Sequence, residues 1–417
     1  MLTVENHFTT SIVGLHSTMM FNSKELRKAD EMARRLCRII SQPHEAHTIH
    51  SIDWPVLGRF AEKQGLGPML YYTLSQLELD SKIDAATWTF LEQSVRRMAL
   101  LHTLFEREQD QIAQMLEDAG VRFLWLKGLS VAKLVYPESY LRPLVDLDLL
   151  VPESQLDTAM GGLLAFGYQI QADESETLLG ANRTIMRKLT HHVVMRRTSE
   201  PAITVELHYR VGNYLAVKQH VDPTQWVWEH TVPNDDGTLV LTLEALLLYL
   251  CAHIALQHGD QAAELKLFLD VHLLITTKQL DWHIIVSQAI YLRWTMAVEH
   301  VLRRTSNMFG THFPVDVIDT LREQRTSDEN ESRFASLQNP GAILVNIEDM
   351  LRQLSMRERL WLIGRILVPS PNYMRNRYQI APGRSVNPYY GLRWWQQTLQ
   401  VGEWAYNWLR NRHQPDT

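Results

Sequence analysis

Two aspartates separated by one residue stand in the apolar segment Val145 to Val151, which reads VDLDLLV. Because the side chains of a β-strand alternate between its two faces, Asp146 and Asp148 are expected on the same face. Two carboxylates about 5–6 Å apart repel each other by roughly 3 kcal/mol at an effective dielectric constant of about 20, so they need a cation nearby. A divalent metal ion supplies that charge, and it also accompanies nucleoside triphosphates into their sites. The aspartate pair therefore indicates a site for Mg2+ and phosphates.

A motif as short as Asp-x-Asp is more often a solvated strand end or a pair of turn residues. Here Leu149, Leu150 and Val151 continue the strand after the acids, so the aspartates belong to an apolar element and not to a polar loop. These surroundings favour the functional interpretation of the pair.

A third acid fits the same design on a second strand. The segment Ala202 to Tyr209 alternates apolar residues with Thr204, Glu206 and His208, as a half-buried strand does. Glu206 is therefore expected to face the two aspartates from a neighbouring strand. The preceding segment, His191 to Arg197, also has a strand pattern, and the polar link between the two segments predicts a hairpin.

Three histidines accompany these strands. Because adjacent residues of a strand point to opposite faces, His191 and His192 are predicted to lie on opposite faces, and one of them is expected to be structural. His208 shares a face with Glu206, so it either orients the site or packs as an ordinary core histidine. Nothing in the chain has the usual spacing of zinc ligands, so a zinc enzyme is not expected.

The order of these residues resembles that of a known family, the uncharacterised nucleotidyltransferases of the polymerase-β-type superfamily. The resemblance covers roughly residues 45 to 300 and includes helical segments on both sides of the strands. The residues that carry it are, in chain order, Ile52-Asp53-Trp54, the turn Lys127-Gly128, Arg142, Asp146-x-Asp148, the His191-His192 strand, Val205-Glu206-Leu207-His208, and then His253, His258, Lys266 and Asp270.

The resemblance implies an α+β fold, in which a small mixed β-sheet forms a nucleotidyltransferase core flanked by N- and C-terminal helical regions. In such a core Asp146, Asp148 and Glu206 would be the catalytic carboxylates and the ligands of Mg2+ or Mn2+. A nucleoside triphosphate is the implied co-substrate.

The resemblance also implies a nucleotide-binding site made by Lys127, Gly128, Arg142 and His208. Gly128 lets the backbone approach a phosphate, and Lys127 adds a positive charge. Arg142 is interpreted as a phosphate clamp, because its planar donors fit phosphate oxygens. The wider superfamily has a Gly-Ser or Gly-Gly turn before its first helix, whereas this chain reads KGLS from Lys127 to Ser130. The triphosphate contacts of this turn therefore stay open.

The composition limits the classes of protein. The 417 residues are 45% hydrophobic, which is enough for two or three globular domains. The net charge of −6 argues against duplex nucleic acid as a partner. Cys37 and Cys251 lie in apolar helical segments, which indicates a reducing compartment. Since the sequence shows no signal peptide and no apolar stretch that could cross a membrane, we expect a cytoplasmic protein without a membrane partner.

Changes of pattern along the chain predict its organisation. Asp53 and Thr242 are predicted to cap the N-termini of helices, and Lys266 with Asp270 is predicted to form a helical i,i+4 pair. The expected segments are an N-terminal extension at 1–22, a helical region at 23–120, the nucleotidyltransferase core at 121–215, a helical domain covering the site at 216–310, and a mostly helical C-terminal extension at 311–417.

The sequence thus predicts a metal-dependent nucleotidyltransferase. It would move a nucleoside monophosphate, AMP by preference, from a triphosphate to a hydroxyl or phosphate of a small-molecule, peptide or protein acceptor. The alternative is a catalytically inactive scaffold of the same fold that binds a nucleotide or a protein. A transferase acting on RNA ends is a third interpretation, which the acidic net charge disfavours. The acceptor, the base preference and the oligomeric state leave no signal in the sequence.

Overall fold

The computed structural model describes ten stretches of the chain, which form two compact units. The larger unit holds the described residues between 20 and 171 and between 191 and 342, and the smaller unit holds those between 172 and 190 and between 343 and 417. The predicted boundaries at 120, 215 and 310 stay predictions. The described residues are 23–43, 52–77, 83–171, 183–198, 202–212, 221–258, 263–325, 354–381, 383–396 and 398.

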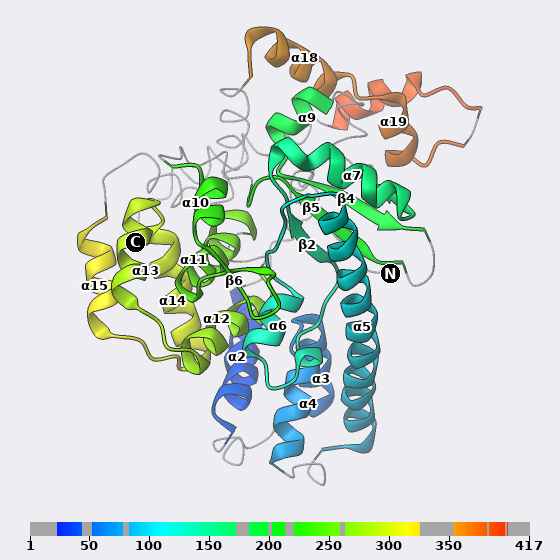
Figure 1. Ribbon diagram of the computed structural model, residues 1–417. Helices are drawn as coiled ribbons and strands as arrows, with labels where there is room; N and C mark the ends of the chain where they lie inside the picture. The colour runs from blue at the N-terminus through cyan, green and yellow to red at the C-terminus, as the bar shows by residue number, and fades with distance from the viewer. Residues whose placement is uncertain are drawn as a thin grey trace, which may run out of the picture. The chain divides into compact units, whose positions relative to one another are not determined.

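A five-stranded mixed sheet lies in the larger unit (Figure 1). Its strands follow the spatial order β1-β2-β5-β4-β3; β2 and β5 are parallel, and the other neighbours are antiparallel. The predicted hairpin is confirmed as β4 and β5. The strands of this sheet are β1 (Leu124–Trp125), β2 (Leu147–Leu150), β3 (Tyr168–Ile170), β4 (His192–Arg197) and β5 (Thr204–His208), and β6 (Thr231–Pro233) with β7 (Leu239–Leu241) forms a separate hairpin.

One face of the sheet packs on the long helix α5 (Ala85–Asp118) and on α7 (Leu156–Ala165), which follows the short 3-10 turn η4 (Glu153–Gln155). Burying one large aliphatic side chain stabilises a fold by about 1.5–3 kcal/mol, and a slip of one residue would turn every such side chain to the other face. The apolar cluster between this face of the sheet and the two helices therefore fixes the register of the strands. Its members include Phe105, Ile112, Leu116, Leu147, Leu149, Leu156, Leu163, Met195, Val205 and Leu207.

The opposite face of the sheet consequently receives the polar residues of the same strands. In the paired rows of β2, β5 and β4, Asp148 lies opposite Glu206, and His208 lies opposite His192. Alternation thus sends the apolar residues to the helices and gathers four ionisable side chains on one face.

Helices before the sheet begin at capping residues that the sequence indicates. Asp53 caps α3 (Trp54–Lys63) by accepting a hydrogen bond from the Val56 amide at 3.1 Å, which confirms the predicted N-cap. Together with α2 (Ser23–Ser41) and α4 (Gly67–Gln76), α3 contributes to a second apolar cluster. The helices described between residues 23 and 120 are α2, α3, α4 and α5.

Helices after the sheet complete that second cluster. Thr242 caps α11 (Leu243–Ala252), again as predicted, and α11 continues into the π-helical segment η5 (His253–His258). All residues of α11 from Ala245 to Ala252 are buried. The remaining helices of this region are α10 (Pro223–Glu229), α12 (Leu265–Thr277), α13 (Trp282–Tyr291), α14 (Thr295–Phe309) and α15 (Val315–Glu323).

The smaller unit contains α9 (Arg183–Leu189), α18 (Met356–Leu367) and α19 (Pro371–Arg377). Lys188 of α9 pairs with Glu358 of α18 at 2.7 Å, and Ser355 forms a capping box with Glu358. The predicted N-terminal extension at 1–22 lies outside the described residues.

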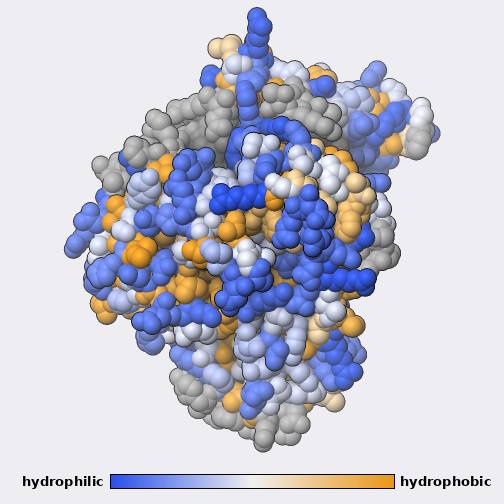
Figure 2. All heavy atoms as spheres, in the orientation of Figure 1, coloured by the Kyte–Doolittle hydropathy of each residue, from blue (hydrophilic) through white to orange (hydrophobic). Residues whose placement is uncertain are grey.

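The observed architecture confirms the predicted α+β fold, with a small mixed sheet between N- and C-terminal helical regions. None of the described helices is long and apolar enough to cross a membrane. Figure 2 shows hydrophilic residues interspersed with smaller hydrophobic groups over the visible face. Most large apolar side chains of the larger unit instead lie in its two buried clusters.

Candidate active site

The parallel pairing of β2 and β5 brings two carboxylates together. Asp148 and Glu206 are directly opposite each other in the strand register. The Asp148 side chain is fully buried and the Glu206 side chain is 12% exposed. Two acids on adjacent buried strands would repel each other strongly, so the surrounding charges decide whether both stay ionised.

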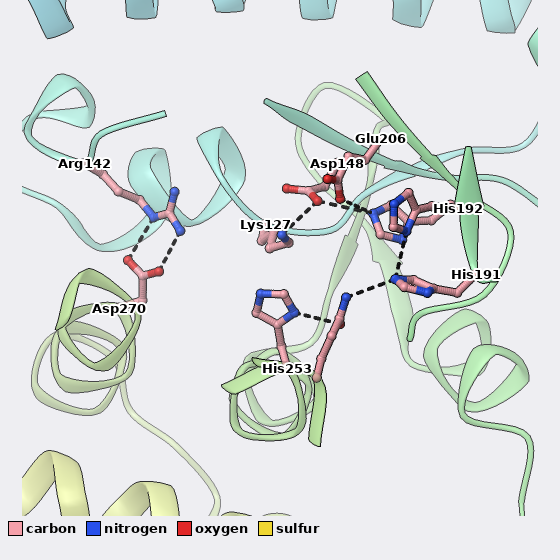
Figure 3. Close-up of polar contacts among 10 residues, drawn as sticks. Lys127, Arg142, Asp148, His191, His192, Glu206, His253 and Asp270 are labelled. Carbon is pink, nitrogen blue, oxygen red and sulfur yellow. Dashed lines mark hydrogen bonds and ion pairs between the residues drawn. The ribbon is translucent and has the colours of Figure 1, made fainter. Parts of the chain in front are cut away.

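Two cationic side chains of the chain itself reach these acids (Figure 3). The Lys127 ammonium lies 2.9 Å from Asp148 Oδ1, and His208 Nε2 lies 3.3 Å from both Asp148 Oδ1 and Glu206 Oε2. Although burial alone would lower the pKa of His208, its contacts with Asp148 and Glu206 raise it to about 8. Burial would raise the pKa of Asp148, yet Lys127 and His208 hold it below its usual value.

The two oxygens of Asp148 differ in their contacts. Asp148 Oδ2 is buried and has no hydrogen-bond partner among the described residues. A buried carboxylate oxygen without a partner is costly, so this atom is a ready ligand for a cation. Oxygen atoms are the ligands that Mg2+ prefers.

Asp146 lies at the edge of this group, because it precedes the first residue of β2. Burial and the charges of Asp148 and Glu206 raise the pKa of Asp146 to about 7. Asp148, Glu206 and His208 offer ligand atoms that all lie within 4.8 Å of one another, and Asp146 is outside that group. The structure therefore brings together two of the three predicted carboxylates and places the third beside them, half-buried.

The turn between β1 and α6 (Leu129–Val135) supplies Lys127 and the glycine. Gly128 has a φ of +66°, a backbone conformation that residues with a side chain rarely adopt. A Cβ atom at this position would lie 4.0 Å from Asp148 Oδ2. The glycine thus keeps the space next to the unpaired carboxylate oxygen open.

The histidines are arranged differently from the prediction. His191 and His192 were predicted on opposite faces, but both rings contact His208, with ring centres 5.5 Å and 5.0 Å away. The prediction is wrong because β4 begins only at His192. His191 occupies a bend before the strand, where the alternation of faces does not apply.

Arg142, predicted to be a phosphate clamp, instead forms an ion pair within the protein. Its Nε and Nη2 atoms donate to the two oxygens of Asp270 at 2.9 Å and 2.7 Å, and the Tyr136 hydroxyl donates to Asp270 at 2.8 Å. Both charged side chains are buried, and Figure 3 shows Arg142 turned toward Asp270. The predicted Lys266–Asp270 pair is wrong, because Asp270 is engaged with Arg142 and the Lys266 ammonium lies 2.7 Å from Glu264.

Sequence reasoning missed Gln257, which connects the helical region to the histidines. The Gln257 amide nitrogen lies 3.0 Å from His191 Nε2, and its oxygen lies 2.9 Å from His253 Nδ1. A single polar residue near a helix end has no distinctive pattern. The π-helical segment η5 that carries Gln257 is a feature often found at functional sites, but it is not visible in the sequence.

Comparison with known families agrees with the fold. The family model described as uncharacterised nucleotidyltransferase matches residues 50–310, which is more than half of the chain. The chain therefore belongs to this family of nucleotidyltransferases. No curated protein and no solved structure matches it.

Proposed function

We propose that this protein transfers a nucleoside monophosphate, AMP by preference, from a triphosphate to a hydroxyl or phosphate of a small-molecule, peptide or protein acceptor. The observation that carries the proposal is the buried pair of Asp148 and Glu206 on parallel strands, with Asp148 Oδ2 lacking a partner among the described residues. Phosphoryl chemistry needs charge neutralisation and alignment more than covalent help from the protein.

The donor atoms of the site fit Mg2+ or Mn2+. Asp148 and Glu206 would hold the ion, and the half-buried Asp146, which lies outside that group of ligand atoms, would be a further oxygen ligand. When bound, such an ion neutralises triphosphate charge and polarises the phosphorus centre. The raised pKa of Asp146, about 7, indicates that this carboxylate also gains from a cation at neutral pH.

The chain's own residues would bind and orient the triphosphate. Lys127 is 13% exposed and carries a flexible ammonium that now pairs with Asp148. In a complex with the triphosphate, Lys127 would offset negative charge on the phosphates. Gly128 leaves room for the backbone to approach a phosphate oxygen. His208 orients both carboxylates through its Nε2 atom.

One observation favours the alternative of an inactive scaffold. Lys127 and His208 already contact Asp148 with positively charged groups, so the acids are partly neutralised without a metal ion. A protein that only binds a nucleotide or a partner would keep such a self-neutralised cluster. The two functions differ in whether pyrophosphate leaves.

The test uses ATP labelled with 32P at the α-phosphate, incubated with the full chain, Mg2+ and an extract of the source cells. Label transferred to an acceptor together with pyrophosphate release supports the transferase, provided that Asp148→Asn abolishes both. Label transfer or pyrophosphate release that is unaffected by Asp148→Asn contradicts it. ATP binding without any transfer favours the scaffold.

A further inference from the structure

Three histidine rings pack together beside the carboxylates. The ring centres of His191 and His192 are 4.2 Å apart, and those of His191 and His208 are 5.5 Å apart. Each ring offers one nitrogen, and the three nitrogens lie within 4.8 Å of one another. His191 and His208 are buried and His192 is half-buried, so the cluster is part of the interior.

Only one of the two ring nitrogens of His208 contacts the carboxylates. Its Nε2 atom faces Asp148 and Glu206, whereas its Nδ1 atom is buried and lacks a hydrogen-bond partner among the described residues. The His208 side chain is only 1% exposed, so water does not readily satisfy that nitrogen. A histidine that donates one nitrogen to a carboxylate and binds a metal with the other is a common arrangement in metal sites.

The contact between His191 and His192 also suits a metal ion. His192 Nδ1 lies 2.8 Å from His191 Nε2, so the two nitrogens must share a proton. A metal ion can replace a shared proton between two imidazoles, since each nitrogen then offers its lone pair to the ion. The Gln257 amide nitrogen, a donor, lies 3.0 Å from the same His191 Nε2 atom, and its oxygen lies 2.9 Å from His253 Nδ1, so an ion at His191 Nε2 would also displace the Gln257 donor.

We propose that His191, His192 and His208 form a second metal site, for a transition-metal ion of the Zn2+ class, adjacent to the carboxylate site. Imidazole nitrogen suits Zn2+, Co2+ and Ni2+, whereas Mg2+ prefers oxygen. The two sites therefore differ in the ion that they select, although His208 belongs to the edge of both. The ligands come from the bend before β4, the first residue of β4 and the last residue of β5, so no single local spacing includes all three.

The inference is independent of nucleotide transfer. An ion on the histidines would fix the His208 ring and, through its Nε2 atom, the positions of Asp148 and Glu206. The ion would thus act on the carboxylates by positioning them, without itself contacting a phosphate. A structural ion of this kind is expected even in a protein that transfers nothing.

The test is titration of the full chain with Zn2+ by calorimetry and with Co2+ by visible absorption, without nucleotide. We expect one strong site per chain and the intense visible bands of nitrogen-bound, four-coordinate Co2+. His192→Gln should weaken binding at least about tenfold and remove the bands. The matched control is His283→Gln, an exposed histidine on α13, which should bind like the wild type.

Three further results bear on the inference. If circular dichroism shows that His192→Gln is unfolded, His191→Gln carries the same expectation. Asp148→Asn should retain the Co2+ bands, because it leaves the three histidines intact, even where it abolishes Mg2+-dependent ATP binding. Zn2+ affinity that is unchanged in both histidine variants, or that is lost only in Asp148→Asn, would overturn the histidine site.

Discussion

At the scale of single residues, the proposed chemistry depends on one buried carboxylate, Asp148, whose two oxygens have different contacts. Asp148 Oδ1 receives Lys127 and His208, whereas Oδ2 has no partner among the described residues. The first oxygen explains why the acid stays ionised inside the protein, and the second explains where a cation would bind. In the metal-free protein, the first feature depends on Lys127 remaining close to Asp148.

Lys127→Met should therefore destabilise the metal-free protein by about 3 kcal/mol, because it leaves a buried charge with a weaker partner. Urea unfolding measures the change. Added Mg2+ should restore part of the lost stability by replacing the missing cation. The control is Lys133→Met, since Lys133 forms an exposed pair with Glu106 at 3.4 Å and should contribute less than about 1 kcal/mol. Equal effects of the two variants would contradict the role of Lys127.

At the scale of elements, the strands and one glycine turn place these residues. Alternation along β2 and β5 predicted that Glu206 faces the acids, and the structure brings Glu206 beside Asp148. The same rule failed at His191, because the residue that begins a strand is set by tertiary packing and not by the local pattern. Strand interiors, which hold Asp148 and Glu206, could be predicted from the sequence, whereas the start of β4, next to His191, could not.

Gly128→Ala tests the turn. The φ of +66° is strained for alanine, so the variant should lose about 1–2 kcal/mol of unfolding free energy. The added methyl would meet Leu144 at 3.6 Å, an ordinary contact, so the loss reports backbone strain and not a clash. Gly161→Ala in α7, where a Cβ meets nothing within 4 Å, should instead stabilise by about 0.5–1 kcal/mol. A stabilised Gly128→Ala would show that the turn is not constrained.

The stability of the protein should decrease at acid pH because of His272 in helix α12. Burial lowers the pKa of His272 to about 4, and its Nδ1 atom lies 2.8 Å from the Thr311 hydroxyl. Below pH 6.5 the unfolded chain binds a proton that the folded chain does not bind, so the stabilisation present above pH 6.5 is lost between pH 6.5 and 4. The loss should amount to about 3 kcal/mol.

Urea unfolding across this pH range measures that loss in the wild type and in His272→Gln, which cannot take up the proton. The variant should show a flatter dependence of stability on pH. The exposed control His283→Gln should keep the wild-type dependence. Parallel curves for wild type and His272→Gln would rule His272 out as the cause.

At the scale of the whole larger unit, the ion pair of Arg142 and Asp270 connects the segment before β2 to helix α12. The family resemblance suggested a phosphate clamp for Arg142, since its planar donors fit phosphate oxygens. Its partner lies 128 positions away in the chain, and such a contact leaves no mark in a single sequence. The fold class and the acids could thus be predicted, but the partners of the buried charges could not.

Arg142→Met should cost about 3–5 kcal/mol, because Asp270 is then buried without its charged partner. The double variant Arg142→Met/Asp270→Leu should recover part of that loss, since the Tyr136 hydroxyl then loses its acceptor. Thermal and urea unfolding measure both changes. If Arg142 is structural, the double variant should also bind Mg2+ and ATP within a few-fold of wild type, since it leaves the carboxylate site intact. A tenfold or larger loss of ATP affinity in the folded double variant would instead support the prediction that Arg142 binds the nucleotide.

The most direct test of a metal-dependent nucleotide site is calorimetric binding of ATP with and without Mg2+. We predict that ATP binds to the wild type only with Mg2+. Binding to Asp148→Asn should be at least about tenfold weaker, because the substitution removes the charge of the carboxylate that carries the unpaired oxygen. Asp110→Asn, which changes an exposed acid on α5, should bind as the wild type does. ATP binding that is indifferent to both Mg2+ and Asp148 would contradict the carboxylate site.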